Sequence, residues 1–285
     1  MTPSLAPTRT SWRTWHRPLL VCTGLMATLV LVCGAGLAVD DRTLLGEPVW
    51  YKPLKFGFAF GLYAATLAWL LAKLNKGRRL AWWLGTVFAV TTVAEVGAVT
   101  VQAARGTISH FNADQADPIT LALTPVLTLG VMVIVIAQLV LGVVVLIQRT
   151  GGPALNRAIR AGTGRAIAGM LIPVYWMVTE INERTVTDAN GRSIPMYLGH
   201  GIGAPDGNGM PLTHWSVTGG DFRVPHFFAL HGIQVLLVLA AILVALSARR
   251  AGCATSRYRP ASSARPPSDT GLVAVVTCRP DAASP

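Results

Sequence analysis

The stretch GGDFRVPHFFALHGIQVLLVLAAILVAL, from Gly219 to Leu246, decides the fold. Its second half is a continuous apolar run, and together with its first half it is long enough to cross a bilayer, which takes about 20 helical residues. The first half nevertheless carries polar side chains, namely Asp221, Arg223, His226, His231 and Gln234. A membrane helix with polar groups at one end indicates that this end faces something other than lipid tails.

The composition of the whole chain agrees with a membrane protein. Of its 285 residues, 52% are hydrophobic and only 13% are charged, which lies outside the range typical of soluble domains. Apolar stretches long enough to span a bilayer occur at about six places. They cover Leu19–Val39, Lys52–Leu74, Leu80–Gln102, Ile119–Ile147, Gly162–Val178 and His226–Leu246. The sequence therefore predicts an all-α fold, a polytopic transmembrane bundle of about six helices.

The basic residues predict the orientation of this bundle, because Lys and Arg are retained on the cytoplasmic side. They gather before the first stretch, between the second and third, between the fourth and fifth, and after the sixth. The other connections mix both signs. We expect a multi-pass protein of the cell inner (plasma) membrane with both termini in the cytoplasm. The stretch Arg13–Val39 also has features of a signal peptide, but its apolar run is longer than a typical signal core, which favours a retained helix.

The chain divides into three predicted regions. Residues 1–18 form a cytoplasmic segment, residues 19–248 form the bundle, and residues 249–285, rich in Pro, Ser, Ala and Arg, form a disordered cytoplasmic tail. One long extracytoplasmic loop covers residues 179–225. Within it, RTVTDANGRSIPMY predicts a small β-hairpin, because a turn sequence separates two β-prone runs. In the second helix, Gly57 and Gly61 form a GxxxG pattern that predicts close helix packing.

Glu95 is the strongest candidate for chemistry. It lies about two turns below the outer end of the third predicted helix, at roughly the depth of His231. A carboxylate at that depth is costly unless it is protonated or has a partner. Lys55, one turn into the second helix, is the expected partner. We interpret Glu95, His231 and Lys55 as a candidate catalytic set.

Further polar and aromatic side chains at the same end predict one wall of a pocket. All histidines except His16 lie on this side. Asp221 and Arg223 are close enough in sequence to pair locally. Glu180 and Glu183 share a face if the fifth helix continues that far. The candidate binding residues are Gln102, Gln234, His226, Asp221, Arg223, His110, Glu180, Glu183, Trp176 and Tyr175.

The sequence assigns no cofactor and predicts no metal site. No spacing of its four cysteines and its histidines is typical of structural zinc. The stretches WYKPLKF, QAARGTISHFN and GGDFRVPHF resemble a family of uncharacterised bacterial multispanning integral membrane proteins. This resemblance covers most of residues 50–112 and 200–234 and implies the multispanning fold and a bacterial membrane location. It implies no activity.

Four functional hypotheses follow. The first is a pocket in the extracytoplasmic half that binds or converts a small lipophilic substrate by acid-base chemistry, for example isoprenoid cyclisation started by a protonated carboxyl group. The others are a proton-coupled transporter, a b-type haem protein with His110 and His226 as axial ligands, and a non-enzymatic membrane assembly subunit. Expected partners are the lipid bilayer, the small lipophilic molecule and other copies in an oligomer, and no nucleic acid. Whether the protein is an enzyme stays open at this point.

Overall fold

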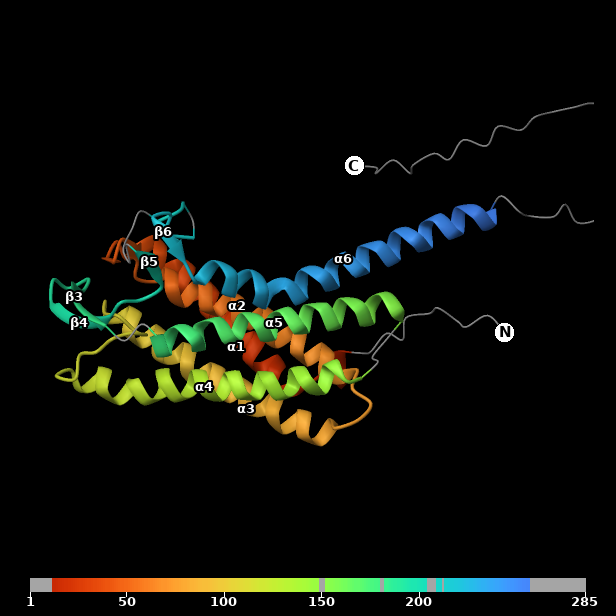
Figure 1. The fold of residues 1–285 in the computed structure, drawn as a ribbon, viewed down its shortest axis with the longest axis horizontal. Coiled ribbons are helices and arrows are strands. Elements are labelled where there is room, and N and C mark those ends of the chain that lie inside the picture. Colours follow the sequence, from red (N-terminus) through yellow and green to blue (C-terminus); the bar gives the residue numbers. More distant parts are fainter. Residues whose placement is uncertain (1–11, 149–151, 180–181, 204–208, 212, 257–285) are drawn as a thin grey trace, which may run out of the picture. The chain divides into compact units, whose positions relative to one another are not determined.

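The computed structural model describes residues 12–148, 152–179, 182–203, 209–211 and 213–256. Over these residues the chain forms six α-helices, shown in Figure 1. They are α1 (Arg17–Val39), α2 (Tyr51–Ala72), α3 (Arg78–Ala104), α4 (Pro118–Leu146), α5 (Pro153–Thr179) and α6 (Arg223–Ser256), preceded by a short 3-10 helix at Trp12–Thr14. Five of them are long and apolar enough to span a membrane: α1, α2, α3, α4 and the Arg223–Ser247 part of α6. The predicted all-α polytopic bundle is confirmed.

Helix α5 differs from the others. It contains the expected stretch Gly162–Val178 but begins at Pro153, and within the described residues it is not among the helices apolar enough to span by composition. Its basic residues Arg157, Arg160 and Arg165 account for this lower hydropathy. Helix α6 extends beyond the expected end to Ser256. Residues 257–285 of the predicted tail lie outside the described residues.

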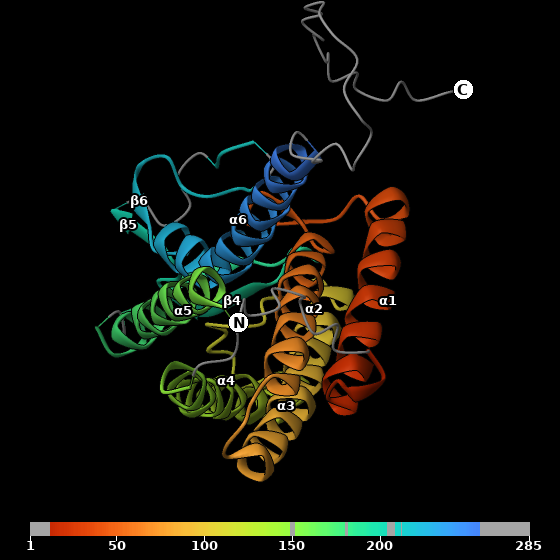
Figure 2. The same ribbon diagram turned by 90° about the vertical axis from the view of Figure 1, so that its right-hand side faces the viewer.

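Glycines permit the closest helix contacts. A Cβ atom on Gly57 would lie 3.2 Å from the backbone oxygen of Met26 in α1, and one on Gly61 would lie 3.1 Å from the Met26 Cβ. The predicted role of this GxxxG pattern in close packing is confirmed, because α2 packs against α1 through it. Helices α1, α2 and α3 lie side by side, as Figure 2 shows.

We call the end of the bundle at which α1, α3 and α5 finish the loop end, and the opposite end, where these helices begin, the basic end. The loop end carries three antiparallel strand pairs. They are β1 (Thr43–Leu44) with β2 (Glu47–Pro48), β3 (Glu183–Thr187) with β4 (Ser193–Tyr197), and β5 (Gly201–Gly203) with β6 (Gly219–Asp221). Pairing of Thr187 with Ser193 confirms the predicted hairpin, and Gly191 adopts the positive φ of 79° that its turn needs.

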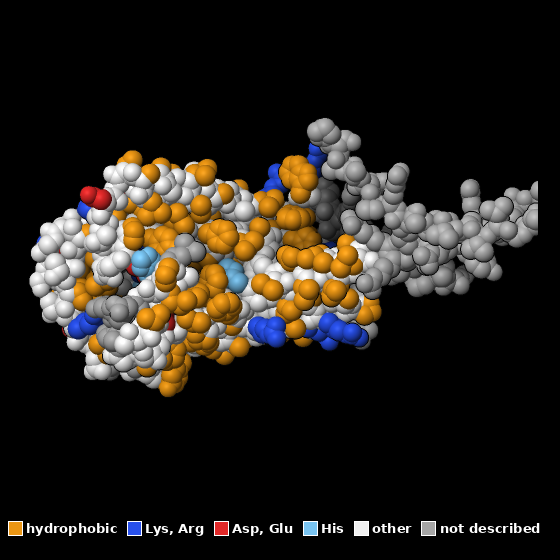
Figure 3. All heavy atoms as spheres, turned by 90° about the horizontal axis from the view of Figure 1, so that it is seen from above, with side chains coloured by type: hydrophobic (Ala, Val, Ile, Leu, Met, Phe, Trp, Pro, Cys, Tyr) orange, Lys and Arg blue, Asp and Glu red, His pale blue; other side chains and the backbone are white. Residues whose placement is uncertain are grey.

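Charged side chains are few on the helical surface of the bundle. On the face in Figure 3, hydrophobic side chains cover the helical part, and the acidic side chains in view lie toward the loop end. Basic side chains in view lie at both ends. The broad apolar surface matches the solvent that a lipid bilayer provides.

Candidate functional site

The centre of the candidate site is a buried pair of side chains. Glu95 on α3 is only 1% exposed, and its Oε1 lies 2.8 Å from Nε2 of His110. His110 belongs to the segment 105–117 that connects α3 to α4, and this segment brings the imidazole back to the helices. The second carboxylate oxygen, Oε2, is also buried and has no hydrogen-bond partner among the described residues. Glu95 therefore has one oxygen paired with an imidazole and one oxygen unpaired.

Gly130 on α4 makes room for this carboxylate. A Cβ atom at that position would lie 2.5 Å from Oε2 of Glu95, which is closer than van der Waals contact allows. The buried Oγ1 of Thr92, three residues before Glu95 on the same helix, also has no hydrogen-bond partner within the described chain. Unpaired polar atoms in a helix interior are costly. Their presence around Glu95 marks this place as more than structural packing.

The expected pairing of Glu95 with Lys55 is wrong. Nζ of Lys55 donates to Oε2 of Glu47 at 2.8 Å and contacts the ring of Tyr51 at 4.4 Å from its centroid. Lys55 lies on the side of α2 that faces the β1–β2 connection, so the carboxylate within its reach is the one at the start of β2. The site loses Lys55 as a direct partner of Glu95.

Lys52, one turn earlier on α2, takes the place expected for Lys55. The charge of Lys52 acts electrostatically on both Glu95 and Glu47. Lys52 also acts electrostatically on His110 and His200. We did not single out Lys52 from the sequence, although its position in WYKPLKF is at the same end of the same helix as Lys55.

His200 forms a second imidazole position near this charge. Its ring contacts Phe111 at 4.8 Å and Trp176 at 5.6 Å between centroids. Burial, reinforced by the charges of Lys52 and Arg223, holds the pKa of His200 well below its ordinary value. Burial likewise lowers the pKa of His110, with Lys52 and His200 adding to the effect. Both imidazoles are thus neutral at physiological pH.

The lowered pKa of His200 predicts a pH effect on stability. In the unfolded chain this histidine takes up a proton near pH 6.5, whereas in the folded chain it does not, so acidification favours unfolding. The stabilising effect is complete above about pH 6.5 and falls by about 1 kcal/mol as the pH drops to about 5.5. Thermal unfolding in detergent should therefore be less sensitive to this pH step in His200→Gln than in the unchanged protein. Equal sensitivity in the two proteins would contradict the assignment.

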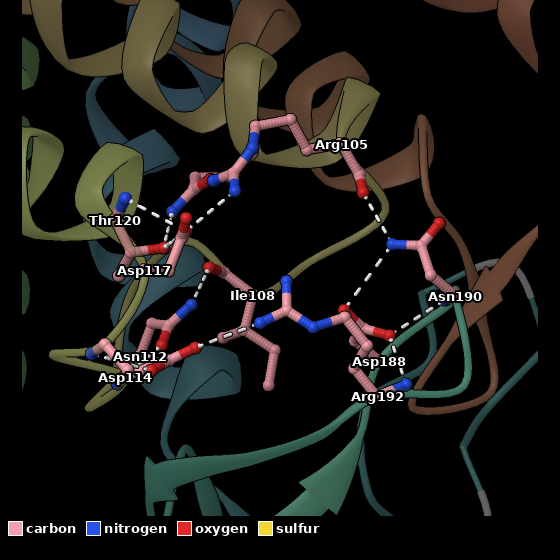
Figure 4. Close-up of polar contacts among 11 residues, drawn as sticks. Arg105, Ile108, Asn112, Asp114, Asp117, Thr120, Asp188, Asn190 and Arg192 are labelled. Carbon is pink, nitrogen blue, oxygen red and sulfur yellow. Dashed lines mark hydrogen bonds and ion pairs between the residues drawn. The ribbon is translucent and has the colours of Figure 1, made fainter.

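Gln102 belongs to a hydrogen-bond network that supports the site. Nη1 of Arg105 donates to its Oε1 at 2.6 Å, and its own Nε2 donates to Oγ1 of Thr120 at 2.9 Å. Arg105 also forms an ion pair with Asp117 at 2.7 Å. Asp117 caps α4 by accepting from the Thr120 amide, and hydrogen bonds from Thr120 and Arg105 lower the pKa of Asp117 to about 2. Figure 4 shows this network at the junction of α3 and α4.

The same network ties the hairpin to the bundle. Nδ2 of Asn190 donates to the carbonyl of Arg105 at 2.7 Å, and Arg192 lies 3.8 Å from Asp114 (Figure 4). The hairpin turn itself is held by Asp188, which accepts from the backbone amides of Asn190 and Arg192. The segment that carries His110 is therefore anchored on both sides.

The predicted local pair of Asp221 and Arg223 is confirmed. Nη2 of Arg223 lies 2.6 Å from Oδ2 of Asp221, and its Nη1 reaches Glu47 at 3.3 Å. Asp221 also accepts from the backbone amide of Ser216. Together with Lys55, these residues form one charge network that joins the starts of α2 and α6.

The histidines of α6 do not join Glu95. Nδ1 of His226 donates to the carbonyl of Gly169 on α5 at 2.7 Å, and the ring of His231 packs on Phe227 at 4.4 Å. Gln234 donates to Oγ1 of Thr66 at 3.4 Å. In the described part of the chain, no hydrogen bond links His231 to Glu95, so a direct relay between them has no geometric support.

The remaining candidate binding residues do not form one group. Trp176 is buried and packs on Phe222 at 4.3 Å, whereas Tyr175 is 63% exposed. Helix α5 ends at Thr179 and Glu183 begins β3, so the expected helical face shared by Glu180 and Glu183 does not form. Glu180 itself lies outside the described residues.

The contacts of the described residues do not favour the metal and haem hypotheses. No group of three or more His, Cys, Asp and Glu side chains within the described residues could hold a metal ion. Nε2 of His110 is engaged with Glu95, and Nδ1 of His226 is engaged with a backbone carbonyl. The geometry favours an acid-base pair over a haem ligand at His110.

Comparisons with protein-family models, with curated proteins and with solved structures give no match.

Proposed function

We propose that this integral membrane protein binds a small lipophilic molecule in the loop-end half of its bundle and exchanges a proton with it at Glu95. The observation that carries the proposal is the buried Glu95–His110 pair with its unpaired carboxylate oxygen. The position of the Lys and Arg residues supports a loop end on the extracytoplasmic side of a plasma membrane. The substrate would then enter from the outer leaflet.

The neighbouring residues can assist both the release and the uptake of a proton at Glu95. The unpaired Oε2 of Glu95 is the atom that would accept or donate the substrate proton. His110, which is neutral, can share the proton through its contact with Oε1. Lys52 adds a positive charge that favours the ionised carboxylate. The buried carboxylate becomes accessible to a ligand only when side chains around it move.

Aromatic side chains define the class of molecule. The ring centroid of Phe56 lies 5.7 Å from that of His110. The ring of Phe60 lies 6.0 Å from that of Phe56. Aromatic faces stabilise positive charge that develops on a hydrocarbon. An isoprenoid whose double bond takes a proton from Glu95 is the specific substrate that this combination suggests.

Native mass spectrometry of the detergent-purified chain tests the proposal. We expect a co-purified lipophile on the unchanged protein and a loss of at least about tenfold in occupancy on Glu95→Gln, which keeps the shape but removes the acid. Gln102→Glu is not a suitable control because it disturbs the Arg105 network, so Tyr175→Phe at an exposed position serves as the matched control. Equal occupancy in unchanged protein and Glu95→Gln would overturn the role of Glu95.

A proton-coupled transporter is the second candidate, and one observation favours it. A polar layer continues toward the basic end, where Gln138 on α4 donates to the hydroxyl of Tyr63 on α2 and Gln234 on α6 reaches Thr66. Oε1 of both glutamines and Oγ1 of Thr163 are buried without partners among the described residues. Gln138 and Thr163 line a cavity of about 10 Å³, together with Tyr63 and Thr66, which is room for one water molecule. Proton uptake into proteoliposomes that depends on Glu95 and Gln138 would favour this candidate over an enzyme.

A further inference from the structure

A groove opens at the basic end, which is the opposite end of the bundle from the site described above. It lies where α1 and α3 begin and α2 ends, and its volume is about 370 Å³. Its walls combine two basic and two indole side chains with the aliphatic end of α2. The residues that matter for its chemistry are Trp15, His16, Arg17, Arg78, Trp82 and Leu71. Figure 2 looks at the bundle from this end.

His16 holds the two walls of the groove together. Its Nδ1 accepts from the backbone amide of Leu19 and thereby caps α1, so the proton of the neutral ring is on Nε2. Nε2 donates to the carbonyl of Trp82 on α3 at 2.9 Å. Burial lowers the pKa of His16, in keeping with a neutral ring. The positive charge of the groove therefore comes from Arg17 and Arg78.

Among the described residues these two arginines have no acidic partner, and the sequence shows why. No Asp or Glu occurs in residues 12–39 or 73–94, the segments that carry the two arginines. Arg17 and Arg78 are both exposed. In the described part of the chain, neither has an ion pair. The described residues therefore leave both guanidinium groups available to an external anion.

The helix ends strengthen the positive field. Arg17 begins α1 and Arg78 begins α3, and neither helix has an acidic residue in its first turn. Gly77 precedes α3 and provides no side-chain cap. The N-terminus of a helix carries a partial positive charge and free amide groups that suit phosphate. At α1 the Leu19 amide is already bonded to His16 and Pro18 has no N–H, so the free amides come from the start of α3. An anion in the groove would therefore be stabilised by this helix end as well as by two guanidinium groups.

The surroundings identify the anion as part of a lipid. Trp82 and its neighbour Trp83 are 44% and 57% exposed, and indole rings prefer the headgroup level of a bilayer. The groove is half apolar, with Leu71 beside the arginines, so it suits a molecule that has both a phosphate and acyl chains. The N-terminal segment before Ser11 contains Arg9 and no acidic residue, and its charge argues against it as the occupant.

We propose that the groove between α1 and α3 binds the headgroup phosphate of an anionic phospholipid. Arg17 and Arg78 donate to the phosphate oxygens from opposite walls, and the acyl chains lie along the apolar surface of α1 and α3. Such a lipid anchors the basic end at the membrane surface. This site is independent of the proposed chemistry at Glu95.

Lipid titration of the full chain in detergent, followed by native mass spectrometry, tests the proposal with phosphatidylglycerol as the probe and phosphatidylcholine as the neutral comparison. We expect the unchanged protein to prefer phosphatidylglycerol by about tenfold or more, and the double substitution Arg17→Gln with Arg78→Gln to bind it about thirtyfold more weakly. Arg79→Gln is the matched control, because it removes the same charge from the adjacent position, which does not line the groove.

Three outcomes would overturn the proposal. One is an equal affinity of the unchanged protein for the two lipids. Another is a loss of phosphatidylglycerol affinity in Arg79→Gln as large as the loss in Arg17→Gln or Arg78→Gln alone. Binding would then depend on the general surface charge and not on the groove. The third is displacement of the lipid by inorganic phosphate at equal concentration, which would mean that the groove selects free phosphate. Circular dichroism of each variant confirms that the helices are intact, so a folding defect is not mistaken for lost binding.

Discussion

Replacing His110 by leucine is expected to lower the free energy of unfolding by about 1–3 kcal/mol, because it leaves the carboxyl group of Glu95 in the helix interior without its hydrogen-bond partner. Glu95 is 1% exposed, so water cannot take over the lost hydrogen bond. Glu95→Leu removes the other partner of this hydrogen bond and leaves the imidazole of His110 unpaired, so it should cost a similar amount, about 1–3 kcal/mol.

The double variant provides the sharper test. With both residues replaced by leucine, neither partner of the hydrogen bond is left unpaired, and replacing both partners by apolar groups can be nearly neutral. We therefore expect the double variant to be more stable than His110→Leu alone. The unchanged protein, the two single variants and the double variant form a double-mutant cycle. Denaturation in mixed micelles with increasing sodium dodecyl sulfate measures the free energy of unfolding of each.

His231 supplies the control for this cycle. It is a histidine of the same half of the bundle, but its described contact is with the Phe227 ring and not with Glu95. Leucine at this position should show no coupling to Glu95→Leu. If His231 couples to Glu95 as strongly as His110 does, or if the double variant is less stable than His110→Leu alone, then the hydrogen bond between Glu95 and His110 does not contribute to stability as the geometry indicates.

The helices could be predicted from the sequence because a bilayer imposes a simple rule. Every backbone polar group within hydrocarbon must be satisfied inside its own helix, so spans are long, continuous and apolar. The bounds of α1 to α4 agree with the predicted stretches to within two residues. Helix α5 begins nine residues earlier than predicted because its first turns are basic, and hydropathy does not detect them.

The partner of Glu95 could not be predicted in the same way. Depth along a helix follows from residue spacing, but the direction in which each helix faces does not. Lys52 and Lys55 are equally plausible by depth, yet only Lys52 interacts with Glu95. His110 comes from a connection whose return toward α3 depends on backbone turns, including positive φ angles at Gly106 and Phe111, that no hydropathy pattern reveals.

Alanine at Gly162 is the second substitution with a large expected effect. A Cβ atom there would lie 2.6 Å from the Cα of Ile233 on α6, and backbone atoms cannot rotate out of the way as a side chain can. The two helices must separate, which costs about 1–3 kcal/mol for an overpacked contact. The same substitution at Gly164 meets no atom within 4 Å and should be neutral or stabilising by up to about 1 kcal/mol, because alanine favours the helix.

The comparison of these two variants tests whether α5 belongs to the bundle, which its composition alone does not establish. Both variants change one glycine of the same helix turn into alanine, so they share any effect on helix propensity. A melting temperature in detergent that falls for Gly162→Ala and not for Gly164→Ala means that α5 packs on α6 through this glycine. Equal behaviour of the two would mean that the contact is not formed. The hydrogen bond from His226 to Gly169 would then also be in doubt, since it crosses the same interface two turns farther along α5.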